Sequence, residues 1–345
     1  MTKKLVDKFG RIITYLRISL TDRCNLRCVY CMPAAGIKLL DRNEILTYEE
    51  ILKIIGVATG LGMSKFRFTG GEPLLRKGAI GFIRKAVALV KSKHRKAEFT
   101  LTTNGILLQR YALRIFNAGV KRINVSMDTL NPEKFKQITR GHGDIKNVIS
   151  GIKTAIRVGF SPVKINVVVV PGFNSDEIES FINFARKSHV AVRFIEQMPF
   201  GRSGLLRKND GSFIPLDKIE TSLVRNYSMV NVKLPGAGPG RHYGFPSPSG
   251  KKTAGQGFIG FIPAISQPFC RMCNRLRLTA DGKIRLCLGY KYEIDIKSAI
   301  RSGATDEQLK LLFTTACGNK PRRHNFRSAQ PAGRPSKECM SRIGG

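Results

Sequence analysis

Apolar segments alternate with amphipathic segments from residue 11 to about residue 196 of the chain. The apolar segments are short and rich in β-branched residues, which predicts strands at residues 13–20, 65–68, 99–102, 122–126, 163–170 and 192–195. Between them, apolar positions recur at helical spacing, which predicts helices at residues 48–60 (with Thr47 as the N-cap), 80–90, 112–118, 145–158 and 176–186. This alternation indicates βα units around a parallel sheet.

Six such units limit the architecture without fixing it. They are too few for a closed barrel of eight units. A doubly wound sheet and an open partial barrel are both compatible with the periodicity. Periodicity alone therefore leaves the choice between these two folds open.

The texture of the chain changes between residues 235 and 257, where proline, glycine and serine are concentrated. This composition predicts a loop or linker. A second module follows, and the basic tail after Lys320 is expected to be irregular. We therefore divide the chain into a first part at residues 1–235 and a second part at residues 236–345.

The composition indicates a folded protein with an unusual charge. The 345 residues are 42% hydrophobic, which is enough to form a core, and they carry a formal net charge of +35. This excess predicts a polyanionic partner, such as nucleic acid, a membrane surface or a phosphorylated small molecule. A solvated basic surface without such a partner is the alternative.

The cysteines need an explanation other than disulfides. Residues 1–11 are charged and lack the apolar core of a signal peptide, and no stretch approaches the roughly 18 apolar residues that span a bilayer. We therefore expect a cytoplasmic protein, with no membrane partner, whose thiols stay reduced. Six of the eight cysteines fall into two triplets, which indicates bound metal.

Cys24, Cys28 and Cys31 form the first triplet, which follows the first predicted strand. A structural zinc site needs four ligands, and no fourth ligand lies nearby in the sequence. Three thiolates suit a [4Fe–4S] cluster with one iron left open. An open iron can bind a small molecule through an amine and a carboxylate, as S-adenosylmethionine offers, and one electron passed to that molecule would release a carbon radical.

Cys270, Cys273 and Cys287 form the second triplet. A zinc ribbon that lacks one ligand and a second cluster with an open iron are both compatible with this spacing, and three cysteines suit the cluster better. Arg275 and Arg277 occupy alternate positions of a predicted strand, so they face the same way. Two guanidinium groups on one face suit a triphosphate, although an exposed basic strand would have the same pattern.

Several motifs resemble those of the radical S-adenosylmethionine superfamily. The first triplet has the superfamily's spacing, with the aromatic Tyr30 before its last cysteine, and the glycine-rich segment 69–73 follows the second predicted strand. Within the superfamily, the chain is most similar to the GTP 3′,8-cyclases of molybdenum cofactor biosynthesis. The similarity covers nearly the whole chain and includes residues 20–33, 67–76, 102–105, 124–128, 194–199, 273–277 and the closing residues 340–345.

The resemblance implies an incomplete (β/α)6 TIM-like barrel, closed on its open side by a C-terminal iron–sulfur domain. It implies two [4Fe–4S] clusters, S-adenosylmethionine as a cofactor and GTP as the substrate. A 5′-deoxyadenosyl radical would take the ribose 3′ hydrogen, and C3′ would attack guanine C8 to give (8S)-3′,8-cyclo-7,8-dihydroguanosine 5′-triphosphate. This product would pass to a cyclic pyranopterin monophosphate synthase. An electron donor would also be needed, and the oligomeric state stays open, a homodimer included.

The resemblance also assigns roles to individual residues. The first triplet would hold the cluster that cleaves S-adenosylmethionine, and the second triplet would hold a cluster whose open iron contacts the guanine. The residues expected to line the S-adenosylmethionine site are Tyr30, Gly71, Ser126 and Met198. The residues expected to contact GTP are Arg17, Arg67, Thr102, Lys164, Arg275, Leu276 and Arg277. The terminal Gly344-Gly345 is expected to reach the catalytic cavity.

Some features do not follow from the resemblance. Gln197 stands where the family usually has an aromatic residue, Cys317 and Cys339 have no assigned role, and the charge of +35 exceeds what one triphosphate needs. A radical enzyme that modifies RNA would explain the charge, but it would need aromatic residues near basic ones, and the chain has no tryptophan. A peptide-modifying radical enzyme would have more C-terminal cysteines. A zinc-knuckle protein would need neither Gly70-Gly71 nor the terminal glycines.

Overall fold

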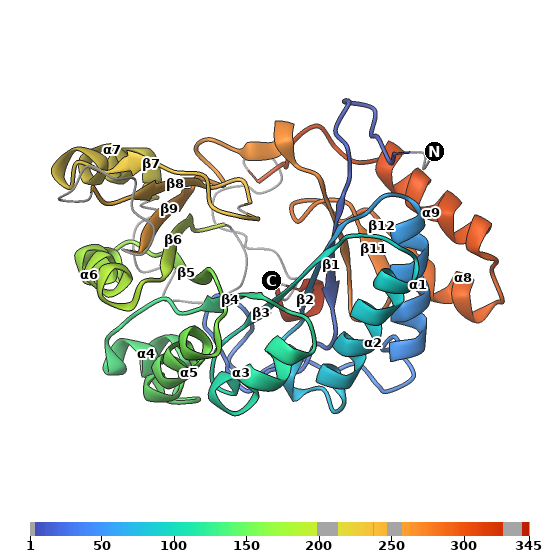
Figure 1. The fold of residues 1–345 in the computed structure, drawn as a ribbon, viewed down its shortest axis with the longest axis horizontal. Helices are drawn as coiled ribbons and strands as arrows, with labels where there is room; N and C mark the ends of the chain where they lie inside the picture. Colours follow the sequence, from blue (N-terminus) through green and yellow to red (C-terminus); the bar gives the residue numbers. More distant parts are fainter. Residues whose placement is uncertain (1–3, 199–212, 237, 247–256, 327–339, 345) are drawn as a thin grey trace.

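A computed structural model of the chain describes residues 4–198, 213–236, 238–246, 257–326 and 340–344 (Figure 1). The strands are β1 Tyr15–Ser19, β2 Lys65–Thr69, β3 Glu98–Thr103, β4 Arg122–Ser126, β5 Val163–Val169, β6 Ala191–Glu196, β7 Val230–Asn231, β8 Arg241–Gly244, β9 Phe258–Ile262, β10 Arg275–Leu278, β11 Lys283–Arg285 and β12 Glu293–Asp295. The helices are α1 Tyr48–Gly60, α2 Ala79–Ser92, α3 Leu108–Asn117, α4 Pro132–Thr139, α5 Ile145–Val158, α6 Ile178–Ser188, α7 Leu216–Asn226, α8 Ile296–Arg301, α9 Asp306–Gly318 and α10 Met340–Ile343. Short 3-10 turns occur at η1 Pro73–Leu75, η2 Ser175–Glu177 and η4 Phe269–Met272.

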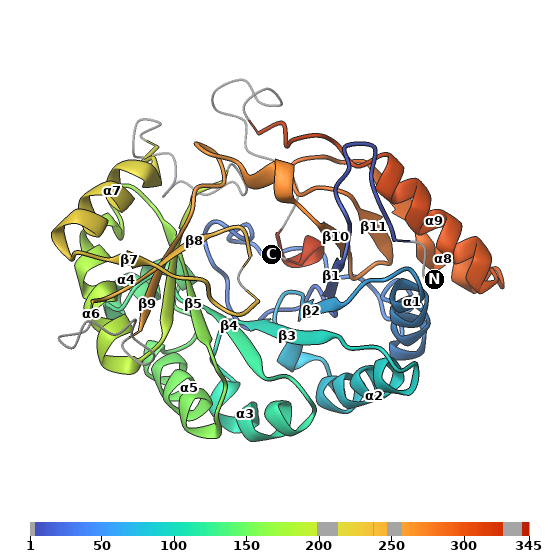
Figure 2. The ribbon, with the colours of Figure 1, turned by 45° about the horizontal axis from the view of Figure 1, so that its top comes forward.

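The order of the strands distinguishes between the two folds that the periodicity allowed. β1 to β6 lie side by side in chain order, and each pairs in parallel with the next. A doubly wound sheet would reverse its strand order at a switch point, and the described sheet does not do so. The six strands curve with helices α1, α2, α3, α5 and α6 on their outer side (Figure 2). The prediction of an incomplete (β/α)6 barrel is therefore confirmed.

The C-terminal part of the chain extends the sheet at both of its ends. At one end β10 pairs in parallel with β1 and continues into the antiparallel β11 and β12. At the other end β9 pairs in parallel with β6 and carries the antiparallel β8 and β7. Figure 2 shows α10 inside the curve of the sheet, between these two extensions. The C-terminal segments thus cover the side that the six-unit barrel leaves open.

The central strands turn alternate side chains to opposite faces of the sheet. Leu16 and Ile18 of β1 are fully buried, as are Phe66 and Phe68 of β2, and they pack into one core with the helices. Burying an apolar side chain of this size contributes about 1.5–3 kcal/mol. The intervening positions, which are mostly polar, lie on the inner face of the barrel.

Local signals at the helix ends explain several element boundaries. Thr47 is the N-cap of α1, as predicted: its hydroxyl accepts a hydrogen bond from the Glu50 N–H at 3.2 Å, and the Glu50 carboxylate accepts one from the Thr47 N–H at 2.7 Å. Asn131 caps the unpredicted α4, and its side chain accepts bonds from the N–H groups of Glu133 and Lys134. Asn131 followed by Pro132 was a usable start signal in the sequence.

Two expectations about irregular segments need correction. The prediction of a loop throughout residues 235–257 is wrong, because Arg241–Gly244 forms β8, which pairs with β9. The tail is irregular through residue 326 where it is described, but Met340–Ile343 forms a helical turn. Both short elements are stabilised by contacts with distant segments, which local composition does not encode.

Two helix boundaries differ modestly from the predictions. α3 begins at Leu108, one turn before the predicted start, and a 3-10 turn occupies the predicted first residues of α6. Ends of helices commonly adopt such tighter turns. None of the helices in the described part of the chain is long and apolar enough to cross a membrane.

Candidate active site

Basic side chains from neighbouring strands lie in one layer on the inner face of the barrel. Arg17 of β1 is in register with Arg67 of β2 on one side and with Arg277 of β10 on the other. Two residues earlier in the same strands, Tyr15 is in register with Lys65 of β2 and with Arg275 of β10. Paired residues at alternate positions share a face, so strand alternation assembles this basic layer from segments that are distant in the sequence.

The opposite wall of the barrel continues the layer. Lys164 of β5 is in register with Asn124 of β4, and Arg193 of β6 is in register with Asn166 of β5. Arg193 is 4% exposed. Its Nη2 donates two hydrogen bonds, one to Asn124 Oδ1 at 2.6 Å and one to Asn166 Oδ1. Lys164 is also buried, and its Nζ donates to the Pro235 carbonyl at 3.3 Å. Hydrogen bonds thus orient both cations, but neutral oxygen acceptors do not balance their charge.

Mutual repulsion and burial shift the pKa values of these cations. Burial, followed by the charge of Arg193, lowers the pKa of Lys164 to about 6. Burial, followed by the charge of Arg67, lowers the pKa of Arg193 to about 9. The pKa of Arg277 is also lowered to about 9, by burial and then by Arg275. Buried like charges of this kind are costly unless an anion binds among them.

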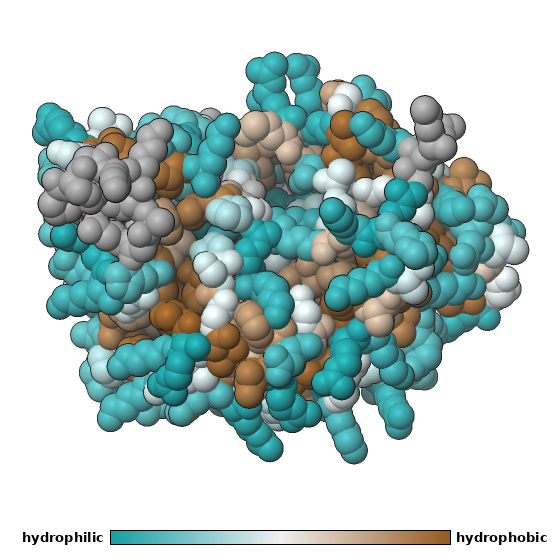
Figure 3. Space-filling model, in the orientation of Figure 1, coloured by the Kyte–Doolittle hydropathy of each residue, from teal (hydrophilic) through white to brown (hydrophobic). Residues whose placement is uncertain are grey.

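Buried polar atoms without partners line the same cavity. Among the described residues, Tyr15 Oη, Arg17 Nε, Thr102 Oγ1, Arg193 Nε and His242 Nε2 are buried and have no hydrogen-bond partner. Buried polar groups are almost always satisfied, so these atoms indicate a missing ligand rich in oxygen acceptors. The surface view in Figure 3 shows a hollow near the middle of the molecule, with hydrophilic residues around it.

Sequence reasoning missed several residues of this layer. Tyr15, Lys65, Arg193 and His242 were not predicted as site residues. The first three contribute to the pKa shifts of predicted residues, whereas the pKa of His242 is itself lowered by burial and then by Arg193. Arg193 could have been found, because it interrupts an apolar strand and such a residue must face either solvent or a polar cavity. His242 lies in β8, within the segment predicted as a loop.

The first cysteine triplet lies in the loop that follows β1. The Cys31 N–H donates to the Cys28 carbonyl at 2.9 Å, and the Leu26 N–H lies 3.4 Å from Cys24 Sγ. Cys24 and Cys28 are partly buried and pack against the main apolar core. The triplet is therefore held in a compact turn at the carboxyl end of a central strand, where barrel enzymes form their sites.

Hydrogen bonds from the C-terminal end of α4 hold this cysteine loop in place. Arg140, which follows α4, donates from Nη1 to the carbonyl of Arg27 at 2.7 Å and to the carbonyl of Met32 at 2.9 Å. These two carbonyls flank the segment that contains Cys28 and Cys31. The Val29 N–H also donates to the Ile138 carbonyl at 2.9 Å. The cysteine loop is thereby attached to the barrel on both sides.

The donor set of the first triplet fits an iron–sulfur cluster better than a single metal ion. Within the described ranges, no three His, Cys, Asp or Glu side chains converge to hold one ion. A [4Fe–4S] cluster is held by cysteine thiolates on different irons, so its ligands need not converge on one point. Cys24, Cys28 and Cys31 supply three thiols on one short loop, which fits such a cluster.

Three of the residues predicted for S-adenosylmethionine lie near the first triplet. Gly71 follows β2, and its N–H donates to the Thr21 carbonyl at 2.6 Å. A Cβ at this position would lie 2.2 Å from the Arg23 carbonyl oxygen, so only glycine fits. The Tyr30 hydroxyl donates to Asp128 Oδ2 at 2.5 Å, just beyond Ser126 at the end of β4. The carboxyl ends of β1, β2 and β4 thus bring these segments to one edge of the barrel.

The chain terminus reaches the same edge. The Met340 N–H donates to the Cys31 carbonyl at 3.3 Å, and Arg277 Nη1 donates to the Gly344 carbonyl at 3.0 Å. The fourth predicted S-adenosylmethionine residue, Met198, packs with Met340 against Ile343. The tail therefore lies between the first triplet and the arginine layer, while Gly345 and Cys339 lie outside the described residues.

The second triplet lies on the far side of the arginine layer. Cys270 is in η4, Cys273 follows it, and Cys287 follows β11. The Cys273 N–H donates to the Cys270 carbonyl at 3.2 Å. The Arg275 guanidinium lies 6.0 Å from the centre of the Tyr15 ring and 5.5 Å from that of Phe269, which connects this triplet to the basic layer.

One predicted GTP contact needs correction for its side chain. Leu276 is fully buried in the apolar core, on the face of β10 opposite to Arg275 and Arg277. Strand alternation requires this orientation once the arginines face the cavity. Only the main chain of Leu276 can therefore reach a ligand in the barrel. Cys317, which had no assigned role, is buried in the same core.

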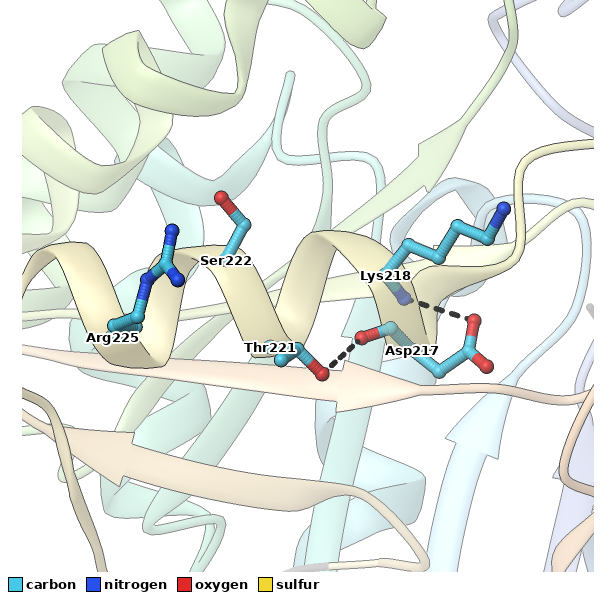
Figure 4. Close-up of a pocket in the computed structure, with 5 residues that line it drawn as sticks. All are labelled: Asp217, Lys218, Thr221, Ser222 and Arg225. Carbon is cyan, nitrogen blue, oxygen red and sulfur yellow. Dashed lines mark hydrogen bonds between the residues drawn. The ribbon is translucent and has the colours of Figure 1, made fainter.

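Two surface depressions lie outside the barrel interior. The first is formed by one face of α7 and is lined by Asp217, Lys218, Thr221, Ser222 and Arg225 (Figure 4). The bonds among these residues are local to the helix, such as that from Thr221 Oγ1 to the Asp217 carbonyl at 2.9 Å. The second lies beside the second triplet and is lined by Pro268, Cys270, Arg271, Arg322 and Arg323. None of the predicted S-adenosylmethionine or GTP residues lines either depression.

Comparisons with known proteins agree with this geometry. Residues 18–185 match the Radical SAM superfamily, and residues 190–326 match the family described as Molybdenum Cofactor Synthesis C. The SuiB structure from Streptococcus suis, bound to S-adenosylmethionine, superposes with a TM-score of 0.54 at 14% identity, covering 85% of this chain and 65% of that chain. This similarity supports the fold.

Curated relatives identify the family. The GTP 3′,8-cyclase of Petrotoga mobilis is 42% identical over 341 residues, covering 99% of this chain and all of the relative. The GTP 3′,8-cyclase of Thermodesulfovibrio yellowstonii is 44% identical over 317 residues, covering 91% of this chain and 94% of the relative. The chain therefore belongs to the GTP 3′,8-cyclase family of the radical S-adenosylmethionine superfamily.

Proposed function

We propose that the protein converts GTP into (8S)-3′,8-cyclo-7,8-dihydroguanosine 5′-triphosphate, which is the first step of molybdenum cofactor biosynthesis. The observation that carries this proposal is the placement of a three-cysteine loop directly after β1 and of a layer of buried cations, unbalanced by carboxylates, on the inner face of the same barrel. Full-length similarity to curated cyclases supports the same reaction. The product would pass to a cyclic pyranopterin monophosphate synthase, and a separate electron donor would be required.

At the first triplet, the proposed roles are binding and shielding. Cys24, Cys28 and Cys31 hold the [4Fe–4S] cluster, while the residues that line the S-adenosylmethionine site are Tyr30, Gly71, Ser126 and Met198. When bound, the cluster and S-adenosylmethionine would supply a 5′-deoxyadenosyl radical. The overall reaction removes the ribose 3′ hydrogen, joins C3′ to guanine C8 and takes up one further electron and one proton, so the dihydroguanosine product keeps the mass of GTP. The Gly71 main chain can approach the methionine part closely because no side chain intervenes. The tail at Met340 and Gly344 helps to exclude water from this space.

In the basic layer, the proposed role is to bind and orient the triphosphate. The side chains assigned to this role are Arg17, Arg67, Thr102, Lys164, Arg275 and Arg277, with the main chain of Leu276. Three observations support the assignment. Strand register aligns the four arginines, the pKa values of Arg17, Lys164 and Arg277 are lowered, and Arg17 Nε and Thr102 Oγ1 are buried without a partner. Arg193 is added to this set because its unpartnered Nε lies in the same layer.

The second triplet is proposed to hold a second [4Fe–4S] cluster through Cys270, Cys273 and Cys287, with an open iron toward the guanine. Its connection to the triphosphate layer through Arg275 and Tyr15 supports a role on the substrate side. The division of the chain into a radical barrel at residues 1–235 and a second-cluster region at residues 236–345 is retained as part of this proposal.

An anaerobic assay tests the proposed reaction. The protein is reconstituted with iron and sulfide, reduced, supplied with S-adenosylmethionine and GTP, and its products are analysed by mass spectrometry. We expect about eight irons per chain, 5′-deoxyadenosine and a cyclic product with the mass of GTP. Formation of 5′-deoxyadenosine with unchanged GTP would keep the radical chemistry and redirect the search to RNA or peptide substrates. Bound zinc in place of iron would exclude the proposal.

A further inference from the structure

Lys320 is a buried lysine that contacts the main chain next to two cysteines of the second triplet. It follows α9, its side chain is 2% exposed, and its Nζ donates to the Arg275 carbonyl at 2.9 Å and to the Leu286 carbonyl at 2.6 Å. Arg275 is two residues after Cys273, and Leu286 immediately precedes Cys287. One ammonium group therefore joins the two chain segments that carry two of the three cysteines.

Among the residues that the structure describes, no carboxylate pairs with the ammonium group of this lysine. Both acceptors of its Nζ are main-chain carbonyls, and within the described ranges no ion pair includes Lys320. Burial lowers the pKa of Lys320, and the thiols of Cys273 and Cys287 act in the opposite direction. An unpaired buried cation is costly, so a lysine in this position needs a negative charge nearby. Cysteine thiolates that bind metal would supply that charge.

Arg11 provides a contrast within the same site. It is also buried, and its Nη1 donates to the Cys270 carbonyl at 2.8 Å, so it supports the segment of the third cysteine. Its Nε, however, forms an ion pair with Asp7 at 2.6 Å, so a buried carboxylate balances this guanidinium group. Both cations favour thiolates in the triplet, but of the two only Lys320 lacks a carboxylate partner among the described residues.

We propose that Lys320 is a positioning residue of the second iron–sulfur site, which joins the segments of Cys273 and Cys287 and raises the reduction potential of the cluster they hold. This inference rests on the proposed second cluster. Its physical basis is that reduction adds negative charge to a cluster, and a buried cation stabilises the more negative state. Because the ammonium also fixes two ligand segments through their carbonyls, its removal should loosen the site as well.

The test isolates the second site in the full-length chain. Cys24, Cys28 and Cys31 are replaced by alanine, and the remaining cluster is titrated potentiometrically with detection by electron paramagnetic resonance. In this background Lys320→Met should lower the reduced-to-oxidised ratio at a fixed potential about tenfold, which corresponds to about 59 mV for one electron. Lys320→Arg keeps the positive charge, so its reduced-to-oxidised ratio should stay closer to that of the parent protein. Lys291→Met, at an exposed lysine four residues after Cys287, is the matched control.

Each outcome decides a separate point. A parent protein that binds no second cluster would contradict the proposed second site itself, before any lysine variant is made. A bound second cluster with the same potential in Lys320→Met and the parent would overturn only the role of Lys320. If Lys320→Met, with the first triplet restored, keeps the first cluster but loses iron from the second, the positioning role is supported. If it loses both clusters, Lys320→Gln is measured, and loss of both there would assign Lys320 to the fold and overturn the proposal.

Discussion

The first cysteine triplet lies beside buried carboxylates, whereas the second lies beside buried cations. Glu72 is fully buried, accepts from the Asn104 N–H at 2.8 Å, and its charge adds to burial in raising the pKa of Cys24. Asp128 acts in the same direction on Cys28, again after burial. At the second triplet, burial opposes ionisation of Cys273, but the charges of Arg275 and Lys320 outweigh it, and the pKa falls to about 7.

This difference indicates that the two sites, although each contains three cysteines, have different roles. Negative charge near a cluster disfavours its reduced state, so a reduced cluster at the first triplet is a stronger electron donor. Positive charge at the second triplet would favour the reduced state of the cluster proposed there, and it attracts anionic ligands, as the proposed role on the substrate side requires. Two sets of three cysteines therefore differ in chemistry because different charged residues are buried around them.

Removing cysteines should give the largest effect and separate the two triplets. Cys24→Ala should abolish cleavage of S-adenosylmethionine, because the cluster that supplies the electron loses a ligand. Cys273→Ala should retain cleavage but lose the cyclic product. Both products are quantified by mass spectrometry after anaerobic turnover, with Cys317→Ala, at a buried core cysteine that belongs to neither triplet, as the control. Full cyclase activity in Cys273→Ala would remove the second triplet from the substrate side.

Removing one charge from the cationic layer should give the second-largest effect, which is a loss of GTP affinity. Arg17→Gln should weaken GTP binding by about 1.5–3 kcal/mol, the worth of a hydrogen bond to a charged group. Cleavage of S-adenosylmethionine and the melting temperature should change little, because Arg17 repels its neighbours when no anion is bound. Anaerobic calorimetry measures the affinity, and Arg95→Gln at an exposed site is the control. An unchanged GTP affinity would exclude Arg17 from the site.

Removing a buried carboxylate beside the first triplet should raise the reduction potential of its cluster toward that expected at the second triplet. Asp128→Asn deletes a negative charge but keeps an oxygen that can accept the Tyr30 hydroxyl. With Cys270, Cys273 and Cys287 replaced by alanine, the reduced-to-oxidised ratio of the remaining cluster at a fixed potential should rise several-fold, as seen by electron paramagnetic resonance. Asp41→Asn, at an exposed aspartate, should leave the ratio unchanged. A fall in the ratio would contradict the electrostatic comparison.

A pH effect on GTP binding should be the smallest. In the free protein the pKa of Lys164 is lowered to about 6, so its amine is neutral at pH 7.5. A bound triphosphate would restore the charge and raise this pKa, so binding takes up as much as one proton and affinity falls as the pH rises above about 6. Calorimetry in two buffers of different ionisation enthalpy detects the proton, and Lys164→Met should abolish its uptake. Absence of uptake at pH 7.5 in the parent would contradict the assignment.

Much of the barrel could be predicted from the sequence because its signals are local. β4 and α5 were predicted to the residue, and Thr47 was predicted as the cap of α1. The orientation of Arg275 and Arg277 followed from strand alternation. The same alternation also fixes Leu276 on the opposite face, so its predicted contact could have been limited to the main chain from the start.

The remaining features depend on contacts between distant segments. β8 is four residues long and pairs with β9, so nothing in its own composition distinguishes it from a loop. Lys320 is one of 59 lysines and arginines, and only the fold shows that it is buried against the carbonyls of Arg275 in β10 and of Leu286 after β11. The opposite charges around the two triplets are equally a result of folding, since Glu72, Asp128 and Lys320 are far from the cysteines they affect or lie in other elements.

Isotope transfer tests the central claim most directly, because it follows the hydrogen from the substrate site to the first triplet's cofactor. GTP labelled with deuterium at the ribose 3′ carbon is incubated anaerobically with the reduced protein and S-adenosylmethionine, and the 5′-deoxyadenosine formed is analysed by mass spectrometry. We predict one deuterium in 5′-deoxyadenosine and a cyclic product that has lost it. Unlabelled 5′-deoxyadenosine, formed while GTP stays intact, would contradict the account.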